Sequence, residues 1–249
     1  MTNPLLDQQR SSAIKNLNKF KLEELPDVDI IMASKRPSLI GRIVENINNQ
    51  VVNINTVCIV TQGYTPQQIQ TLKVSIKNAR KLIITEDNDP SHFAGYRNNI
   101  NMQNTQSDYI AIMDDDDIYF PNYLLGQLSY LYQSNYAMVL KGNPIARDEN
   151  VNKIGFIKPG FSTGDNLPGP GGTYLFKRST YDQYGPFMNT RTGYDNAFIR
   201  KVASNGEKLS SSDSFNFILT RGRPEGNTWN DIGLTNLYLN NISFKEIMV

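Results

Sequence analysis

The chain alternates short apolar runs with segments in which apolar residues recur every three or four positions. Apolar runs bounded by polar turns are typical of buried strands, and the wider spacing is typical of helices packed on one face. The predicted strands in the first half cover residues 28–33, 56–60, 82–85 and 109–113. The predicted helices between them cover residues 39–47, 67–77 and 96–104. Strands that alternate with helices predict a parallel sheet covered on both faces.

The second half carries a less regular pattern. It predicts a helix from Pro121 through Leu128 and another from Gly193 to Gly206, together with strands at 137–140, 173–177 and 215–220. Residues 155–172 are rich in Gly and Pro and predict a long loop, and such loops are usually functional or disordered. We therefore expect one domain over 27–230, with a nucleotide-binding half (27–120) and an acceptor half (121–230).

Two terminal segments flank this domain. Residues 7–25 predict a helix that Pro26 ends, with Ile14, Leu17 and Leu25 on one stripe, so that 1–26 form a helical arm. Residues 231–249 form an amphipathic tail that contains Leu234, Leu237 and Leu239. We expect the arm to pack on the domain, with a membrane-facing arm as the alternative. For the tail, packing on its own domain and docking on a partner domain or a membrane surface both stay open.

Composition excludes several classes of protein. The chain has 249 residues, a formal net charge of +1 and no long Lys/Arg run, which argues against a nucleic-acid partner. Its one cysteine, Cys58, lies in an apolar run and excludes an intrachain disulfide, which fits a reducing compartment. No signal pattern opens the chain, and no stretch approaches 18 apolar residues. We expect a cytoplasmic protein, with peripheral association with the inner face of the membrane as a further option.

Four consecutive aspartates, Asp114 to Asp117, directly follow the apolar run 109–113. Adjacent carboxylates repel one another unless a cation is present, and clustered oxygen ligands suit a divalent metal. In open α/β sheets, ligands bind at the carboxyl ends of strands. The run therefore predicts a metal-dependent enzyme whose substrate carries phosphates, although a solvated turn before a helix remains the alternative. A calcium loop of the EF-hand type fits poorly, because Tyr119 and Leu125 occupy its glycine and glutamate positions.

Right-handed crossovers place the ends of the predicted strands along one edge, so Ser34, Gln62, Glu86 and Asp114 should converge there. Other phosphate-binding and catalytic motifs are missing. The sequence has neither G-x-G-x-x-G after its first strand nor G-x-x-x-x-G-K-[ST]. His92 is its one histidine, which leaves little material for a Ser-His-Asp triad.

Four stretches together resemble the GT-A fold of nucleotide-sugar glycosyltransferases, especially the large inverting family 2, over roughly residues 27–230. They are residues 29–37 (first strand and nucleotide turn), Arg97-Asn98-Asn99 (an Arg-Asn pair), Asp114-Asp115-Asp116 (the D-x-D motif) and Gly193-Tyr194-Asp195-Asn196 followed by Lys201 and Gly206 (the Glu-Asp motif). The resemblance implies a single α/β domain with a mostly parallel, Rossmann-like sheet flanked by helices.

The same resemblance implies the site residues. Mn²⁺ or Mg²⁺ would be held by Asp116 and Asp114, with Asp114 also contacting the sugar nucleotide. The other implied nucleotide-sugar contacts are Ala33, Ser34, Arg36, Gln62, Glu86, Arg97, Asp115, Gly172, Arg221, Arg223 and Trp229. Arg97 would pair with Glu86 or Asp87 or reach a phosphate. Because the family often carries a late histidine where this chain has Arg221 and Arg223, these arginines would replace part of the metal's charge.

Asp195 is the expected general base. An inverting transfer needs a carboxylate that takes the proton of the acceptor hydroxyl. A plain helix N-cap is the alternative role for Asp195. The family's Glu is replaced by Tyr194, and a retaining mechanism opens if Asp195 is not the base.

The implied activity is transfer of a sugar, expected from a UDP-sugar, to a hydroxyl of a glycan or lipid-linked acceptor in polysaccharide biosynthesis. The rivals are a retaining transferase, a sugar-phosphate nucleotidyltransferase and a non-catalytic metal- or nucleotide-binding module.

Overall fold

A computed structural model describes residues 4–142, 144–149, 153–157, 169–222, 237–238 and 244–249. The strands are β1 (Val28–Ser34), β2 (Ile54–Thr61), β3 (Lys81–Glu86), β4 (Tyr109–Ile112), β5 (Ile118–Tyr119), β6 (Met138–Lys141), β7 (Ile145–Asp148), β8 (Lys153–Ile157), β9 (Leu175–Lys177), β10 (Leu209–Ser212), β11 (Phe217–Arg221) and β12 (Leu237–Tyr238). The α-helices are α1 (Pro4–Leu17), α2 (Ile40–Asn48), α3 (Pro66–Ser75), α4 (Ala94–Met102), α5 (Tyr123–Leu131), α6 (Arg178–Tyr184), α7 (Tyr194–Ser204) and α8 (Phe244–Ile247). Three 3₁₀ turns cover η1 (Leu22–Glu24), η2 (Pro37–Leu39) and η3 (Gly171–Thr173).

A seven-stranded sheet with the order β10-β6-β9-β4-β1-β2-β3 forms the centre of the molecule. Strands β1, β2, β3 and β4 pair in parallel, whereas β9 runs antiparallel to both β4 and β6. The last residues of β1, β2 and β3 are in register, because Ser34 pairs with Thr61 and Thr61 pairs with Glu86. The prediction of a mostly parallel sheet whose strand ends share one edge is confirmed.

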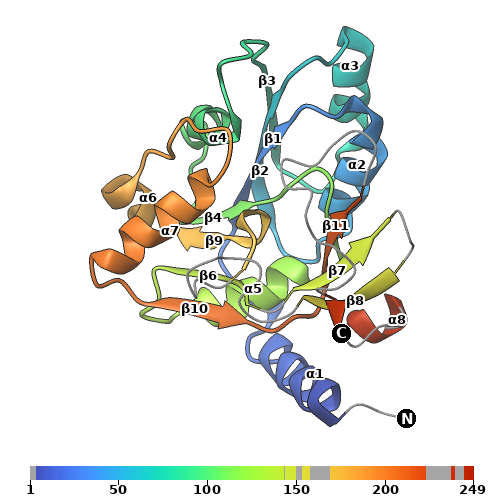
Figure 1. The fold of residues 1–249 in the computed structure, drawn as a ribbon, viewed down its shortest axis with the longest axis vertical. Coiled ribbons are helices and arrows are strands. Elements are labelled where there is room, and N and C mark those ends of the chain that lie inside the picture. Colours follow the sequence, from blue (N-terminus) through green and yellow to red (C-terminus); the bar gives the residue numbers. More distant parts are fainter. Residues whose placement is uncertain (1–3, 143, 150–152, 158–168, 223–236, 239–243) are drawn as a thin grey trace.

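Helices cover both faces of this sheet, as Figure 1 shows. Ile30 and Met32 of β1 point to one face, where they join a core with Ile43, Ile47 and Leu72 of α2 and α3. Ile31 and Cys58 point to the other face and join a core with residues of α4 and α7. The alternation of side chains along β1 thus accounts for two apolar layers, and it explains why residues 30–33 of this strand are all apolar.

A second sheet with the order β12-β8-β7-β11-β5 lies beside the first. Strand β5 follows the aspartate run directly and pairs antiparallel with β11, with Phe217 opposite Tyr119 and Ile218 opposite Ile118. This pairing brings the end of β11 next to the aspartate turn, although about a hundred residues separate them in sequence. The sequence pattern did not predict this sheet.

Several predicted boundaries are wrong. The helix predicted over 7–25 ends at Leu17, and Phe20, beyond its end, packs edge-on against Tyr132 at 5.2 Å between ring centres. Within α1 it is Ala13 that is buried, whereas Ile14 is 43% exposed. Helix α5 begins at Tyr123 rather than Pro121.

The loop predicted over 155–172 is wrong at both ends, where β8 and η3 form. Residues 158–168 and 223–236 lie outside the described residues, and with them Arg223, Trp229 and Leu234. Leu239 also lies outside them. Leu237 belongs to β12, which pairs with β8. None of the helices in the described part of the chain is long and apolar enough to span a membrane.

Candidate active site

The aspartate run forms the centre of the site. Three of its carboxylates, from Asp114, Asp116 and Asp117, place one oxygen each within 4.8 Å of one another. Burial and the neighbouring carboxylates raise the pKa of Asp114 well above its usual value, and burial with the charge of Asp116 raises the pKa of Asp117 to about 7. Carboxylates gathered in this way repel one another, and a divalent cation relieves that repulsion. The donor set is all oxygen, which suits Mg²⁺ or Mn²⁺.

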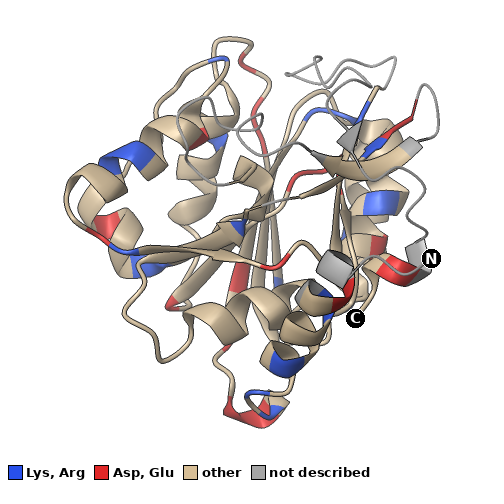
Figure 2. Cartoon of the chain, turned by 60° about the horizontal axis from the view of Figure 1, so that its bottom comes forward, with Lys and Arg blue, Asp and Glu red and all other residues tan. Residues whose placement is uncertain are grey.

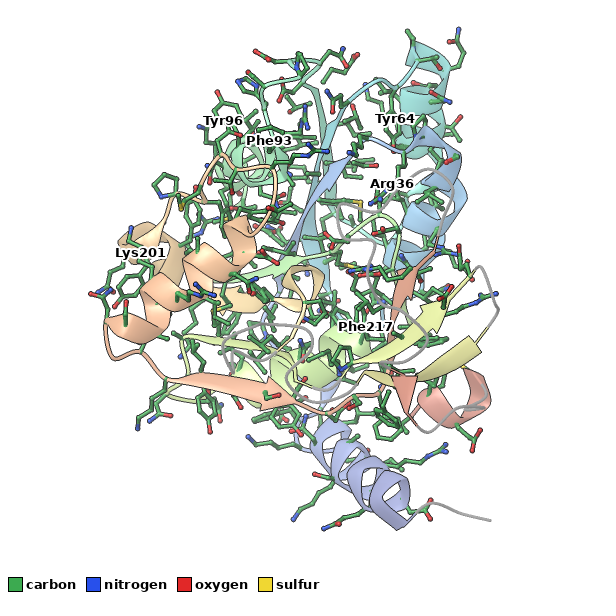
Figure 3. All side chains as sticks on the ribbon, viewed as in Figure 1. Arg36, Tyr64, Phe93, Tyr96, Lys201 and Phe217 are labelled. Carbon is green, nitrogen blue, oxygen red and sulfur yellow. The ribbon has the colours of Figure 1, made fainter. Side chains whose placement is uncertain are left out.

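Asp115 is not part of this group of three carboxylates. Its carboxylate accepts hydrogen bonds from Ser34 Oγ at 2.5 Å and from Arg36 Nε at 2.9 Å. The side chain of Asp115 is 1% exposed, and burial raises its pKa while the Arg36 contacts lower it. Tyr64 completes the arrangement, because its hydroxyl lies 2.6 Å from Ser34 Oγ. Figure 3 shows Arg36 and Tyr64 on the side of the site next to α2 and α3. A contact between Asp115 and a sugar nucleotide stays a prediction.

Asp117 is a residue of the cluster that the sequence reasoning did not select. Its Oδ1 accepts a hydrogen bond from the Thr220 backbone N–H at 2.8 Å and lies 3.5 Å from Arg221 NH1. Its Oδ2 is buried and has no hydrogen-bond partner among the described residues. Such an orphaned oxygen beside two other carboxylates fits a metal ligand. The sequence does show that Asp117 belongs to the aspartate run. It does not show the pairing of β5 with β11, which brings Thr220 and Arg221 next to Asp117.

Two arginines offset part of the charge of the four aspartates. Arg36 reaches Asp115 and also lies 3.0 Å from Asp116 Oδ2, and Arg221 lies beside Asp117. Four carboxylates and two guanidinium groups leave a formal charge of −2, which equals the charge that one divalent ion would neutralise. Figure 2 shows acidic and basic residues interspersed over the described chain, so this concentration of charge is local.

Asp195 lies across a glycine pair from the cluster. It is the second residue of α7, whose N-cap Gly193 adopts φ +75°. A Cβ on Gly171 would lie 2.7 Å from Asp195 Cβ, and a Cβ on Gly172 would lie 2.6 Å from Asp114 Oδ2. Asp195 and Asp114 therefore contact neighbouring residues of one short turn. Burial raises the pKa of Asp195, and backbone N–H groups and Arg221 oppose the shift.

The predicted nucleotide residues follow the register of the strands. Gln62 donates its backbone N–H to the Ser34 carbonyl at 2.9 Å, directly beyond the paired ends of β1 and β2. Ala33 is half-buried at the end of β1, and Glu86 is exposed at the end of β3. These positions place the three residues at the predicted edge, and their contacts with a nucleotide remain predictions.

Arg97 is buried and pairs with Asp87 rather than Glu86. Its Nε lies 3.3 Å from Asp87 Oδ2, and its NH2 group donates to the carbonyls of Asp87 and Asp89. His92 binds the same carboxylate through Nδ1 at 3.0 Å and stacks on Tyr96. Asp87 was one of the two predicted carboxylate partners, and the contact of His92 with the same carboxylate was not predicted.

Comparisons with known proteins identify the family and the fold. No curated protein matches the chain, but the model of the family described as glycosyl transferase family 2 matches residues 30–202. Among solved structures, the fold is similar to the mannosyltransferase PcManGT from Pyrobaculum calidifontis in complex with GDP-Man and Mn²⁺, at 13% identity and a TM-score of 0.58. It is also similar to residues 1–349 of TarS from S. aureus in complex with UDP-GlcNAc, at 14% identity and a TM-score of 0.60.

The match covers most of this chain but a smaller share of each solved structure. The match covers 88% of this chain and 68% of PcManGT, and 81% of this chain and 60% of the TarS fragment. At these identities the solved structures support the GT-A fold, and the family model extends over more than half of the chain. The chain belongs to glycosyl transferase family 2.

Proposed function

We propose that the chain is an inverting, metal-assisted glycosyltransferase that moves a sugar from a nucleotide sugar to an acceptor hydroxyl. One observation carries the proposal. A cluster of three carboxylates and a separate carboxylate at a helix start flank the same Gly171-Gly172 turn. A transferase of this kind needs a cation near the leaving diphosphate and a base near the acceptor, and these two groups are the candidates.

Asp114, Asp116 and Asp117 would hold Mn²⁺ or Mg²⁺. The orphaned Oδ2 of Asp117, the raised pKa values and the residual charge of −2 all suit a divalent ion at this place. When bound, the ion would supply charge neutralisation for the departing nucleoside diphosphate. Arg221, whose NH1 lies 3.5 Å from Asp117 Oδ1, would add a second positive charge to that side.

Asp195 would act as the general base. The acceptor oxygen forms a bond to the anomeric carbon while the bond from that carbon to the diphosphate oxygen breaks, and the electron pair leaves with the diphosphate. Asp195 takes the proton of the acceptor hydroxyl. Burial raises the pKa of Asp195, which makes its carboxylate a stronger base than one in water.

The remaining parts of the proposal concern specificity and context. We propose a UDP-sugar as donor and a glycan or lipid-linked acceptor, in a cytoplasmic protein that can associate with the inner face of a membrane. One structural neighbour holds GDP-Man and another holds UDP-GlcNAc, so both nucleotides belong in the test. Within the domain, we propose that residues 27–120 bind the nucleotide and residues 121–230 bind the acceptor.

Calorimetric titration tests the nucleotide and the metal. The protein is titrated with UDP and, separately, with GDP, each with Mn²⁺ and with a chelator. We expect UDP to bind in a Mn²⁺-dependent way, and Asp116→Ala to abolish the Mn²⁺ dependence while thermal unfolding stays cooperative. Absence of binding by either nucleotide would contradict the proposal, and binding of GDP alone would change the donor class.

Substitution of Asp195 tests the base. Release of UDP from a UDP-sugar, with water or an added glycan as acceptor, is followed for the wild type and for Asp195→Asn. We expect turnover to fall by roughly two orders of magnitude or more, because general-base catalysis contributes about 10²–10⁴-fold. Affinity for UDP and Mn²⁺ should change little. Wild-type turnover by Asp195→Asn would remove this residue from the mechanism and reopen a retaining route.

A further inference from the structure

The hydroxyl of Tyr119 joins two parts of the site that come from opposite halves of the chain. It accepts a hydrogen bond from the Asp114 backbone N–H at 2.8 Å and donates one to the Gly172 carbonyl at 2.7 Å. Tyr119 is 2% exposed, and its ring packs against Tyr123 and Phe217 at 4.7 and 5.2 Å between ring centres. The ring is therefore fixed in the core while its hydroxyl reaches the aspartate turn and the glycine turn.

The glycine turn is enclosed on both sides by acidic side chains. A Cβ on Gly172 would lie 2.6 Å from Asp114 Oδ2 and 3.0 Å from the Tyr119 hydroxyl. A Cβ on Gly171 would lie 2.7 and 2.9 Å from Asp195 Cβ and Cγ. Any side chain at either position would displace a carboxylate, so the backbone itself acts as the spacer between Asp114 and Asp195.

Buried polar groups hold this turn from the other direction. The Thr173 carbonyl accepts a hydrogen bond from Gln127 Nε2 of α5 at 2.8 Å, and Thr173 Oγ1 donates to the Pro170 carbonyl at 2.6 Å. The Lys141 backbone N–H donates to Thr173 Oγ1 at 3.2 Å. The turn is thus anchored on the side of β6 and α5, and Tyr119 supplies the connection on the side of the aspartates.

We infer that Tyr119 is a positioning residue that sets the separation between the metal-binding carboxylates and the base. Its hydroxyl fixes Gly172 relative to Asp114, and the Gly171-Gly172 backbone carries that position to Asp195. The inference rests on the proposed function, because it assigns the two carboxylates different roles in one transfer. It adds a residue that touches neither reacting atom and acts through the geometry of the turn.

Tyr119→Phe keeps the ring and removes the hydroxyl, and Tyr123→Phe is the matched control. Tyr123 is a neighbouring phenol, equally buried and packed on Tyr119, and its hydroxyl makes no hydrogen bond to the glycine turn among the described residues. We expect Tyr119→Phe to lower kcat for UDP release roughly 10- to 100-fold, because small misplacements of reacting groups cost that much. KM for the UDP-sugar and the Mn²⁺-dependent affinity for UDP should change less than about threefold, because a loss confined to the transition state lowers kcat and leaves ground-state binding in place.

Amide hydrogen exchange gives a second measurement that needs no substrate. The peptide that spans residues 169–175 should exchange faster in Tyr119→Phe than in the wild type, and it should be unchanged in Tyr123→Phe. Equal exchange in all three proteins, or equal loss of kcat in the two variants, would overturn the inference. If Asp116→Ala and Asp195→Asn turn over at the wild-type rate, the proposed function fails instead, and the exchange experiment still decides whether Tyr119 fixes the turn.

Discussion

Substitution of Arg36 by Gln removes a positive charge that offsets the aspartate run whether or not a metal ion is bound. Arg36 Nε lies 2.9 Å from Asp115 Oδ1, and Arg36 NH1 lies 3.0 Å from Asp116 Oδ2. The side chains of Arg36, Asp115 and Asp116 are 14, 1 and 7% exposed, so little water can replace the guanidinium group. Removing one partner of such a buried pair costs about 3–5 kcal/mol.

The expected loss can be read as a melting temperature. In a domain of this size, about 1 kcal/mol corresponds to a shift of roughly 2–4 °C. Without metal, Arg36→Gln should therefore lower Tm by roughly 6–20 °C on the same scale. Burial raises the pKa of Asp115 and Arg36 lowers it, so the substitution leaves that pKa higher still. Protonation then relieves the variant, and the difference in Tm should shrink as the pH falls below the raised pKa.

Manganese should rescue the variant more than it stabilises the wild type. The formal charge of the cluster and its arginines changes from −2 to −3, which strengthens the attraction of a divalent ion. A ligand that binds only the folded state stabilises it by about 2.7 kcal/mol at a concentration of 100 Kd. The assay is thermal unfolding followed by circular dichroism, with and without Mn²⁺, and Lys35→Gln, an exposed neighbour, is the control. If Arg36→Gln melts like Lys35→Gln, or if Mn²⁺ raises both Tm values equally, the charge argument is refuted.

Further measurements test other parts of the molecule. Burial and Asp116 raise the pKa of Asp117 to about 7, so the folded metal-free protein holds a proton that the unfolded chain has lost. Relative to Asp117→Asn, the wild type should therefore lose about 1.4 kcal/mol of stability per pH unit between about pH 5 and 7, and no more above pH 7. Parallel curves of stability against pH for the two proteins would contradict this. Lys141 is fully buried and lies 3.1 Å from Asp213, so Lys141→Met should cost about 3–5 kcal/mol in urea unfolding. The double variant Lys141→Met with Asp213→Leu should recover most of that loss, and a double variant as unstable as the single one would argue against the pair.

The elements that the sequence predicted best are those whose side chains are buried on both faces. Strands β1, β2 and β4 each contain four consecutive apolar residues, at 30–33, 57–60 and 109–112, and such runs identify a central strand without reference to the rest of the fold. Strand β10 reads Leu-Ser-Ser-Ser and forms because it pairs in parallel with β6. Its stability comes from a partner distant in sequence, which no local pattern reveals. The same holds for β5, which has two residues and depends on β11.

The site shows the same limit. The run Asp114–Asp117 predicts a cation site, but its four residues are identical in type. They are distinguished only by the residues that contact them in the folded protein. Asp115 meets Arg36, and Asp117 meets the Thr220 backbone and Arg221. These contacts depend on how β1 and β11 approach the turn, and the roles within the run could not be separated before the fold was known.

Residues 27–120 and residues 121–230 each contain only part of the candidate site. The half 27–120 contains all four aspartates and Arg36, which leaves a formal charge of −3 without Arg221. The Gly171-Gly172 turn, Arg221 and Asp195 belong to the other half, and strand β9 from that half pairs with the edge of β4. A fragment ending at residue 120 would therefore expose that edge and lack the group that offsets Asp117. Divalent-metal affinity and the stability of the β4–β9 pairing should consequently change together, because β4 leads directly into the aspartates and pairs with β9.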